Sequence, residues 1–459
     1  GRDARRSGGI RRMSETTDTI GAYAAAFERF ETSLNGGADT ALHGKRREAI
    51  SRLVQDGLPT ARFEAWRHTN PASMTRACFV PVAEPGHLTA SSIEAFLIAG
   101  TSAVLVFADG RFVPELSRRE TLPEGLRVSN LATVTDVEEP ALMAALGAHT
   151  LGENSGFSAL NTAFIHDAAV IAIDSGCTVD EPVQILHVRT SQPGLTAPRT
   201  LVVAESDSRV SIVETFVGMA SGAGSLTASV AEIVVGRASV VEHTRIHLHG
   251  AEGHHAGTVH VAEEEDARYT GHSFGLAGRF VREDVHTVLN GERIESTLNG
   301  LSLPLGGDHV DNYTTIEHTA ASCRSHELYK GVVGGRAHSV FRGKILVHQA
   351  AQKTDAYQSN QNLLMSDDAE IDSKPQLEIY ADDVKCSHGS TTGQLDPDAL
   401  FYLRARGLGL RQAQRVLTRA FAGELVDRLH HEGLHHHVDA LVSDRLDAVL
   451  ADPDHGDSL

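Results

Sequence analysis

The chain has 459 residues, 41% of them hydrophobic, which is enough for one large domain or two to three smaller ones with a sizeable core. Its 41 Lys and Arg against 60 Asp and Glu give a net charge of −19, which argues against a surface built for nucleic acid or anionic lipid. Because there is no run of about 18 apolar residues and no signal-peptide core, we expect no membrane contact, no secretion and a cytoplasmic location.

Cysteine usage indicates reduced thiols. The four cysteines are scattered without any C-x-x-C pair, which predicts neither a disulfide framework nor a local zinc or iron-sulfur binding run. The opening GRDARRSGGIRR is charged and Gly-rich without periodicity, so residues 1–12 are not expected to be part of the fold. The cysteines are Cys78, Cys177, Cys323 and Cys386.

The first third of the chain is predicted to be largely helical. From residue 19 to about 67, apolar residues recur every three or four positions, with a break at 57–60 before a short helix that carries Trp66. The apolar run 104–107 predicts a strand that turns at Asp109 and Gly110 into a hairpin. A helical pattern returns near 141–146. We therefore expect a mostly helical N-terminal domain over 13–165.

Short β-rich runs dominate beyond about residue 164, with no helix pattern before Asp396. An antiparallel sandwich also has closely spaced strands and is the alternative. A steady interval is typical of a solenoid, so a parallel β-helix core is predicted over 166–395. In the second half the runs begin near residues 267, 281, 293, 309, 324, 338, 354 and 369, which are 12 to 16 residues apart.

Helices are expected again over 396–459. Asp396 as N-cap, Pro397 in the first turn and Gly407 as a stop predict one short helix, and a second is expected from about 411 to 430. Part of the second helix's apolar stripe is expected to pack on its own domain. A stripe this wide at the end of a solenoid can also dock a partner. The candidate docking residues are Val416, Leu417, Ala420 and Phe421.

The sequence has no signature of nucleotide binding or of common hydrolases. The Gly-Lys pairs at 44–45 and 343–344 are followed by Arg46 and Ile345, so neither is a P-loop. No dinucleotide fingerprint, G-x-S-x-G or H-E-x-x-H is present. We expect no nucleotide bound by this chain and no catalytic residues.

Two groups of histidines are weighed as metal ligands. A strand over 243–249 places His243, His247 and His249 on one face, where His-x-His could bind zinc or iron. Arg245 in the same row repels a cation, so a solvated polar face of the sheet is favoured. A second group has helical spacing, typical of adventitious metal uptake on a solvated face. It comprises His430, His431, His435, His436 and His437.

The sharpest candidate site is DDVKCSHG at 382–389. In an extended strand Cys386 and His388 point the same way, and a thiolate beside an imidazole suits iron or zinc. Two ligands cannot hold a cluster, so a metal site here requires further ligands from a partner chain. The alternative is a buried cysteine and a hydrogen-bonded histidine.

The stretch from 341 to 429 resembles the SufD branch of the SufB/SufD family of the SUF iron-sulfur assembly system. It contains FRGKILVHQAAQKTDAYQSNQNLLMSDDAEIDSKPQLEIYADDVKCSHGSTTGQLDPDALFYLRARGL. GLPTARFEAWRHT, FADGRFVPELS, FSALNTAFIHD and SHELYKGVVGGRAHSVFRGK extend the likeness over nearly the whole chain after Met13. The SufB branch typically has Glu in place of Gly389 and an additional cysteine motif, so CSHG followed by TTGQLD resembles SufD.

The resemblance implies a right-handed parallel β-helix between helical domains, in a non-catalytic scaffold that pairs with SufB and binds the SufC ATPase through its C-terminal helices. It implies that His388 faces a SufB cysteine where a transient iron-sulfur cluster forms, with Cys386 adjacent. Flavin binding by the assembled complex and homodimer formation by the isolated chain stay open.

Two other interpretations compete with the scaffold. One is a β-helical polysaccharide lyase or hydrolase, against which the missing signal peptide and the lack of an evident Asp ladder argue. The other is a homodimeric interaction module without metal.

Overall fold

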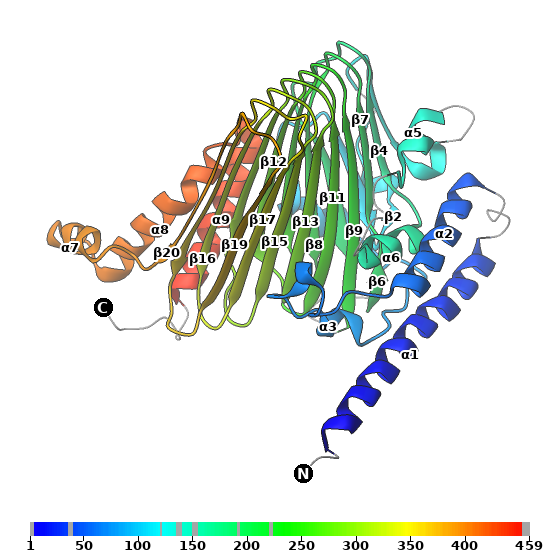
Figure 1. Cartoon of the computed structure of the whole chain (residues 1–459), viewed down its shortest axis with the longest axis horizontal. Coiled ribbons are helices and arrows are strands. Elements are labelled where there is room, and N and C mark those ends of the chain that lie inside the picture. Colours follow the sequence, from blue (N-terminus) through cyan, green and yellow to red (C-terminus); the bar gives the residue numbers. More distant parts are fainter. Residues whose placement is uncertain are drawn as a thin grey trace.

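A computed structural model describes residues 4–34, 40–119, 122–134, 140–148, 155–190, 193–219 and 224–451. Figure 1 shows a long stack of strands with helices from both ends of the chain beside it. The backbone of α1 (Ala4–Ser33) already begins within the segment 1–12, whose side chains lie outside the described residues. The predicted mainly β fold is confirmed.

In the described part of the chain two ten-stranded sheets form the solenoid, and from β7 onward successive strands alternate between them. From β4 onward neighbouring strands run parallel, as where Arg324 lies beside both Glu295 and Asp355. One coil holds one strand of each sheet, so the interval of roughly 15 residues in the sequence is half a coil. The predicted parallel solenoid is confirmed and the antiparallel sandwich is wrong. The strands are β4 (Ala169–Ile173), β5 (Val183–Arg189), β6 (Gly194–Thr196), β7 (Arg199–Ala204), β8 (Arg209–Gly218), β9 (Ser225–Val235), β10 (Val240–Leu248), β11 (Gly253–Glu263), β12 (Arg268–Ala277), β13 (Phe280–Leu289), β14 (Glu295–Ser302), β15 (His309–His318), β16 (Arg324–Val333), β17 (His338–Val347), β18 (Asp355–Leu364), β19 (Glu370–Ile379) and β20 (Lys385–Gly393).

One corner of the solenoid repeats an unusual turn. A positive φ costs a residue with a side chain about 1 kcal/mol or more. The turn amide donates to a carbonyl of the next coil, as from Asp266 N–H to the Glu292 carbonyl at 3.0 Å, so the ladder between coils continues through the corner and offsets this strain. Six non-glycine residues there have φ between 57° and 63°: Asp207, Ala238, Asp266, Arg293, Ser322 and Lys353.

The segment before the solenoid supplies strands as well as helices. β1 (Ala103–Ala108) pairs in parallel with β5 and in antiparallel with β2 (Arg111–Phe112), and β3 (Leu126–Asn130) pairs with β4. Asp109 and Gly110 have φ of 48° and 82°, as a type I′ turn requires, so the predicted hairpin is confirmed. The helices are α2 (Ala41–Asp56), η2 (Glu64–Trp66), α3 (Ala72–Thr75), α4 (Ala90–Ile93), η3 (Glu94–Phe96), η4 (Pro114–Leu116), η5 (Leu131–Thr133), α5 (Pro140–Ala145) and α6 (Gly156–Phe164).

Within the described residues three helices follow the last strand: α7 (Pro397–Ala405), α8 (Leu410–Val426) and α9 (Glu432–Ala451). The Asp396 carboxylate accepts the Asp398 N–H at 2.9 Å, so the predicted helix start is confirmed. None of the helices in the described ranges is long and apolar enough to cross a membrane.

Apolar clusters hold these layers together. One fills the space between the two sheets, and a second lies between the sheet that ends in β20 and the C-terminal helices. In the second, Ile246 and Phe274 of the sheet share a cluster with Leu425 of α8 and Leu446 of α9. Burying each such side chain stabilises the fold by about 1.5–3 kcal/mol. The packing of α8 and α9 therefore stabilises the solenoid.

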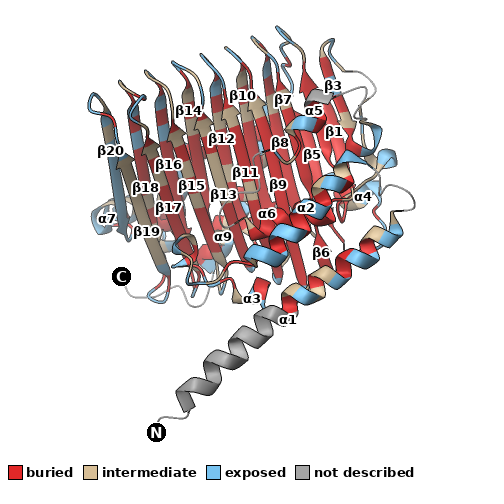
Figure 2. Cartoon of the chain, turned by 45° about the vertical axis from the view of Figure 1, so that its right-hand side comes forward, coloured by how far each residue is buried: buried red, intermediate tan, exposed pale blue. Residues whose placement is uncertain are grey.

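The solenoid ends in two strands that are paired on one edge only. β19 and β20 are the outermost strands of their sheets, with no strand beyond them in the described part of the chain. Figure 2 shows buried strands through the body of the solenoid and an exposed β20. Every residue of β20 except Cys386 is exposed. Such an edge leaves backbone N–H and C=O groups available for pairing with another strand.

Candidate functional site

The predicted pair Cys386 and His388 lies on β20, at this open end. Because the strand is extended, the two side chains point to the same side, as the sequence predicts. His388 lies beside Gln358 of β18, which lies beside Glu327 of β16. Gln358 and Glu327 are fully buried, so this row of side chains faces the inside of the solenoid. His388 is its exposed, outermost member.

Cys386 differs from His388 in burial and in proton binding. It is half-buried, beside the buried cluster that contains Ile345 and Ala356. Burial, with a smaller contribution from the Asp355 carboxylate, raises the pKa of its thiol. The protonated thiol is therefore favoured, and a thiol must lose its proton before it binds a metal. His388 is the better-placed ligand of the two.

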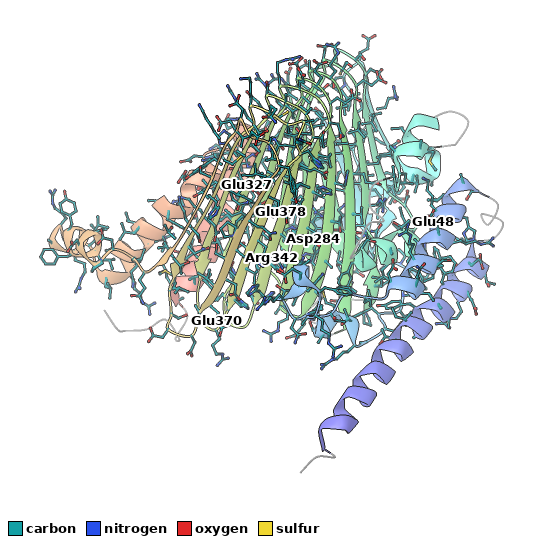
Figure 3. All side chains as sticks on the ribbon, in the orientation of Figure 1. Glu48, Asp284, Glu327, Arg342, Glu370 and Glu378 are labelled. Carbon is teal, nitrogen blue, oxygen red and sulfur yellow. The ribbon has the colours of Figure 1, made fainter. Side chains whose placement is uncertain are left out.

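A buried acid lies inward of His388. Gln358 Nε2 donates a hydrogen bond to Glu327, whose position inside the solenoid is labelled in Figure 3. Gly343 of the facing sheet makes room for the amide, because a Cβ there would collide with it. Burial raises the pKa of Glu327 to about 7. The open end therefore combines an imidazole, a thiol and a carboxyl group that exchanges its proton near neutral pH.

Apolar side chains flank this polar edge. Tyr357, on β18 beside Ser387, is 46% exposed, and Ile379 and Tyr380, at the end of β19, are 39% and 63% exposed. Exposed aromatic groups next to unpaired strands are typical of a surface that meets another protein.

The predicted docking stripe on α8 is divided between solvent and the fold. Val416 is 46% exposed and Ala420 is also exposed, whereas Leu417 and Phe421 are half-buried in the cluster under the helix. Lys330 donates to the Phe421 carbonyl at 3.0 Å, and its ammonium lies 4.4 Å from the Phe421 ring centre. Two of the four residues, Leu417 and Phe421, thus pack within the chain and are not free to dock a partner.

Two exposed aromatic residues on α7 were missed as binding residues. Phe401 is 73% exposed and Tyr402 is 56% exposed, while Leu400 is the buried residue of this helix. Their apolar character was visible in the sequence, but their exposure was not. A short helix with large apolar groups in solvent is a stronger docking feature than Leu417 or Phe421.

The histidine row on β10 lies inside the solenoid, so the expected solvated face is wrong. His243, Arg245, His247 and His249 are at most 5% exposed. β10 is paired on both edges, and these side chains point toward the facing sheet. Buried acids balance the row: His243 Nε2 lies 2.7 Å from a Glu214 oxygen, and Arg245 donates to a carboxylate on β13.

The histidines near the C-terminus match their predicted solvated face in part. His430 and His436 are exposed, which confirms the predicted solvated face for these two. His431 pairs with Glu181, and burial lowers the pKa of His437.

Comparisons with known proteins match most of the chain. The family model described as SUF system FeS cluster assembly, SufBD core domain, matches residues 187–421, and the SufBD protein N-terminal region matches 17–185. The chain is 34% identical over 402 residues to the iron-sulfur cluster assembly protein SufD of Escherichia coli strain K12, which covers 86% of this chain and 91% of that protein.

Two further relatives extend over similar lengths. An iron-sulfur cluster assembly SufBD family protein of Synechocystis sp. is 32% identical over 408 residues, 87% of this chain and 90% of that protein. Protein ABCI7, chloroplastic, of Arabidopsis thaliana is 25% identical over 437 residues, 91% of each chain.

Proposed function

The chain belongs to the SufBD family of the SUF iron-sulfur cluster assembly system, and from that premise we propose that it is a scaffold subunit without catalytic residues of its own. The observation that carries the proposal is the open end of the solenoid, where an exposed edge strand presents His388 beside apolar groups. The polysaccharide-active alternative has no comparable feature in its favour.

In this proposal the open end pairs with SufB. Unpaired strands add to a partner's strands through main-chain hydrogen bonds, and Tyr357, Ile379 and Tyr380 supply apolar contact area beside them. His388 then lies at the junction, where its imidazole binds iron of the nascent cluster together with thiolates of the partner. A neutral imidazole adds no charge, so a mixed site holds the cluster less tightly than four thiolates. That suits a scaffold that passes its product on.

The SufC ATPase is proposed to dock on the C-terminal helices. Phe401 and Tyr402 of α7 and Val416 and Ala420 of α8 expose apolar surface to solvent. The sequence has no phosphate-binding loop, so the nucleotide chemistry is assigned to SufC.

Co-expression with SufB and SufC, followed by anaerobic purification with iron and sulfide analysis, tests this function. We expect one complex of the three proteins that assembles iron and sulfide, and no ATP hydrolysis by the chain alone. Self-pairing through the same edge is expected when SufB is absent. A chain that does not co-purify with SufB, or that hydrolyses ATP after removal of contaminants, would contradict the proposal.

A further inference from the structure

Three buried histidines from the two facing sheets meet inside the solenoid. His247 lies on β10, His249 is the first residue after that strand, and His255 lies on β11 of the other sheet. One ring nitrogen of each lies within 4.8 Å of the other two. The ring centres are 4.7, 4.7 and 5.6 Å apart.

These separations fit three ligands around one ion. A zinc-bound imidazole nitrogen lies about 2.1 Å from the metal, so two such nitrogens at the tetrahedral angle are about 3.4 Å apart and their ring centres about 5 Å apart. His247 Nδ1 and His249 Nε2 are 3.4 Å apart. For His255 the nitrogen-to-nitrogen separations are at most 4.8 Å, so its ring must move closer to complete the set.

The hydrogen bonds of His255 use one ring nitrogen, Nε2, and leave Nδ1 without a hydrogen-bond partner. Its Nε2 lies 2.8 Å from Glu283 Oε1 and 3.1 Å from Ser229 Oγ, while its Nδ1 is buried without a hydrogen-bond partner. A ring that donates its Nε2–H to a carboxylate presents a lone pair on Nδ1, which is how metal-bound histidines are usually held. His247 Nε2 is likewise buried without a hydrogen bond, 3.6 Å from Glu283 Oε1.

The positive charge of Arg245, beside the three rings, is paired with carboxylates. Arg245 pairs with Glu283, and its Nε lies 3.8 Å from Glu214, while Arg189 lies near Asp109. Two carboxylates therefore face the Arg245 guanidinium. The repulsion by Arg245 is thus balanced. All three rings are buried, with His247, His249 and His255 at most 5% exposed.

We propose that His247, His249 and His255 bind one divalent transition-metal ion, zinc or ferrous iron, inside the solenoid. Imidazole nitrogens select such ions over magnesium and calcium. Glu283 orients His255, and a water would complete a four-coordinate ion. The site is separate from the strand that carries His388 and does not depend on the proposed pairing with SufB.

Titration of the full-length chain with Co²⁺ tests the site. The experiment uses a background in which His435 and His436 are replaced by Asn, because neighbouring histidines on a helix can take up metal without a built site. We expect visible d–d bands of a four-coordinate ion that saturate at about one equivalent. Anaerobic competition with Zn²⁺ and with Fe²⁺ then ranks the two natural candidates.

Variants separate binding from folding. His249→Ala and Glu283→Gln are each expected to weaken Co²⁺ binding about tenfold or more, and to abolish the rise in melting temperature that the metal produces. His318→Gln is the matched control, since His318 is also buried but bonds to Ser325 at 2.9 Å. Absence of Co²⁺ bands in the background protein, or unchanged affinity in a folded His249→Ala variant, would overturn the proposal.

Discussion

His388 and Cys386 lie two residues apart on one strand, yet burial gives them different roles. We expect His388→Ala to abolish cluster assembly in a complex that still contains SufB and SufC, because it removes the proposed ligand, an exposed side chain, without touching the core. Cys386→Ala is expected to have a smaller effect, because burial keeps its thiol protonated. Anaerobic iron and sulfide analysis of the purified complexes measures both.

The matched control is His326→Ala, which removes an exposed histidine two strands inward, on β16. It is expected to assemble clusters normally. Normal assembly by His388→Ala as well would make His388 a structural residue.

Glu263, on β11, links stability to pH. It is fully buried, and burial raises its pKa from 4.5 to about 8. The folded chain therefore holds a proton that the unfolded chain releases, so this group's stabilisation is complete below about pH 4.5 and is lost as the pH rises through 8. Glu263→Gln keeps the shape and removes this loss.

We expect the variant to gain stability relative to the wild type by up to about 1.4 kcal/mol for each pH unit between pH 7 and 8. Urea unfolding at these two pH values measures the difference, and the buried histidines contribute little above their usual titration range. An equal dependence on pH in both proteins would show that Glu263 is ionised in the fold.

The C-terminal helices combine packing with proposed docking. Deletion from Asp396 onward is a poor test of docking, because it would expose Ile246 and Phe274 under α8 and α9. We instead expect the double variant Phe401→Ser, Val416→Ser to bind SufC at least about tenfold more weakly, since exposed apolar anchors dominate such interfaces.

Binding measured by calorimetry tests this, with Val54→Ser as the control, because Val54 on α2 is 52% exposed and lies far along the chain from these helices. SufB pairing is expected to be unchanged in both proteins. Undiminished SufC affinity in the double variant would place the dock elsewhere.

The repeated corner turn carries strain that a single substitution can relieve. Ala238 has φ of 57° and no side-chain hydrogen bond to gain from that conformation. Ala238→Gly is expected to stabilise the chain by up to about 1 kcal/mol, the net of relieved strain and the greater freedom of glycine in the unfolded chain. Urea unfolding checks this, and Ala231→Gly, within β9, is expected to destabilise it.

A stack of coils is most stable in its middle, because each coil is held only by its neighbours. β10 is paired with β8 and β12, whereas β20 is paired with β18 alone. We expect hydrogen exchange of backbone amides to be slowest around β10 and fastest in β20, and β20 to become protected when SufB binds. Uniform exchange rates along the solenoid, or no protection of β20 in the complex, would contradict this.

Local rules were enough to predict several elements of this chain, although not α9 or β3. The strand interval follows from the length of half a coil, and the hairpin at Asp109 and Gly110 follows from the positive φ that Asp-Gly tolerates. The cap at Asp396 follows from the orphan N–H groups of a helix start. The common side of Cys386 and His388 follows from the two-residue period of a strand. Each depends on residues within a few positions of one another.

Burial was decided only by the stacking of coils. The row from His243 to His249 is as polar as a solvated strand face, but it is enclosed by the facing sheet and balanced by Glu214 and Glu283, 29 and 38 residues from their partners. The exposure of Phe401 likewise depends on which face of α7 the solenoid leaves uncovered. A sequence pattern fixes which side chains share a face, whereas contacts between segments far apart in the chain decide whether that face meets water, a carboxylate or another sheet.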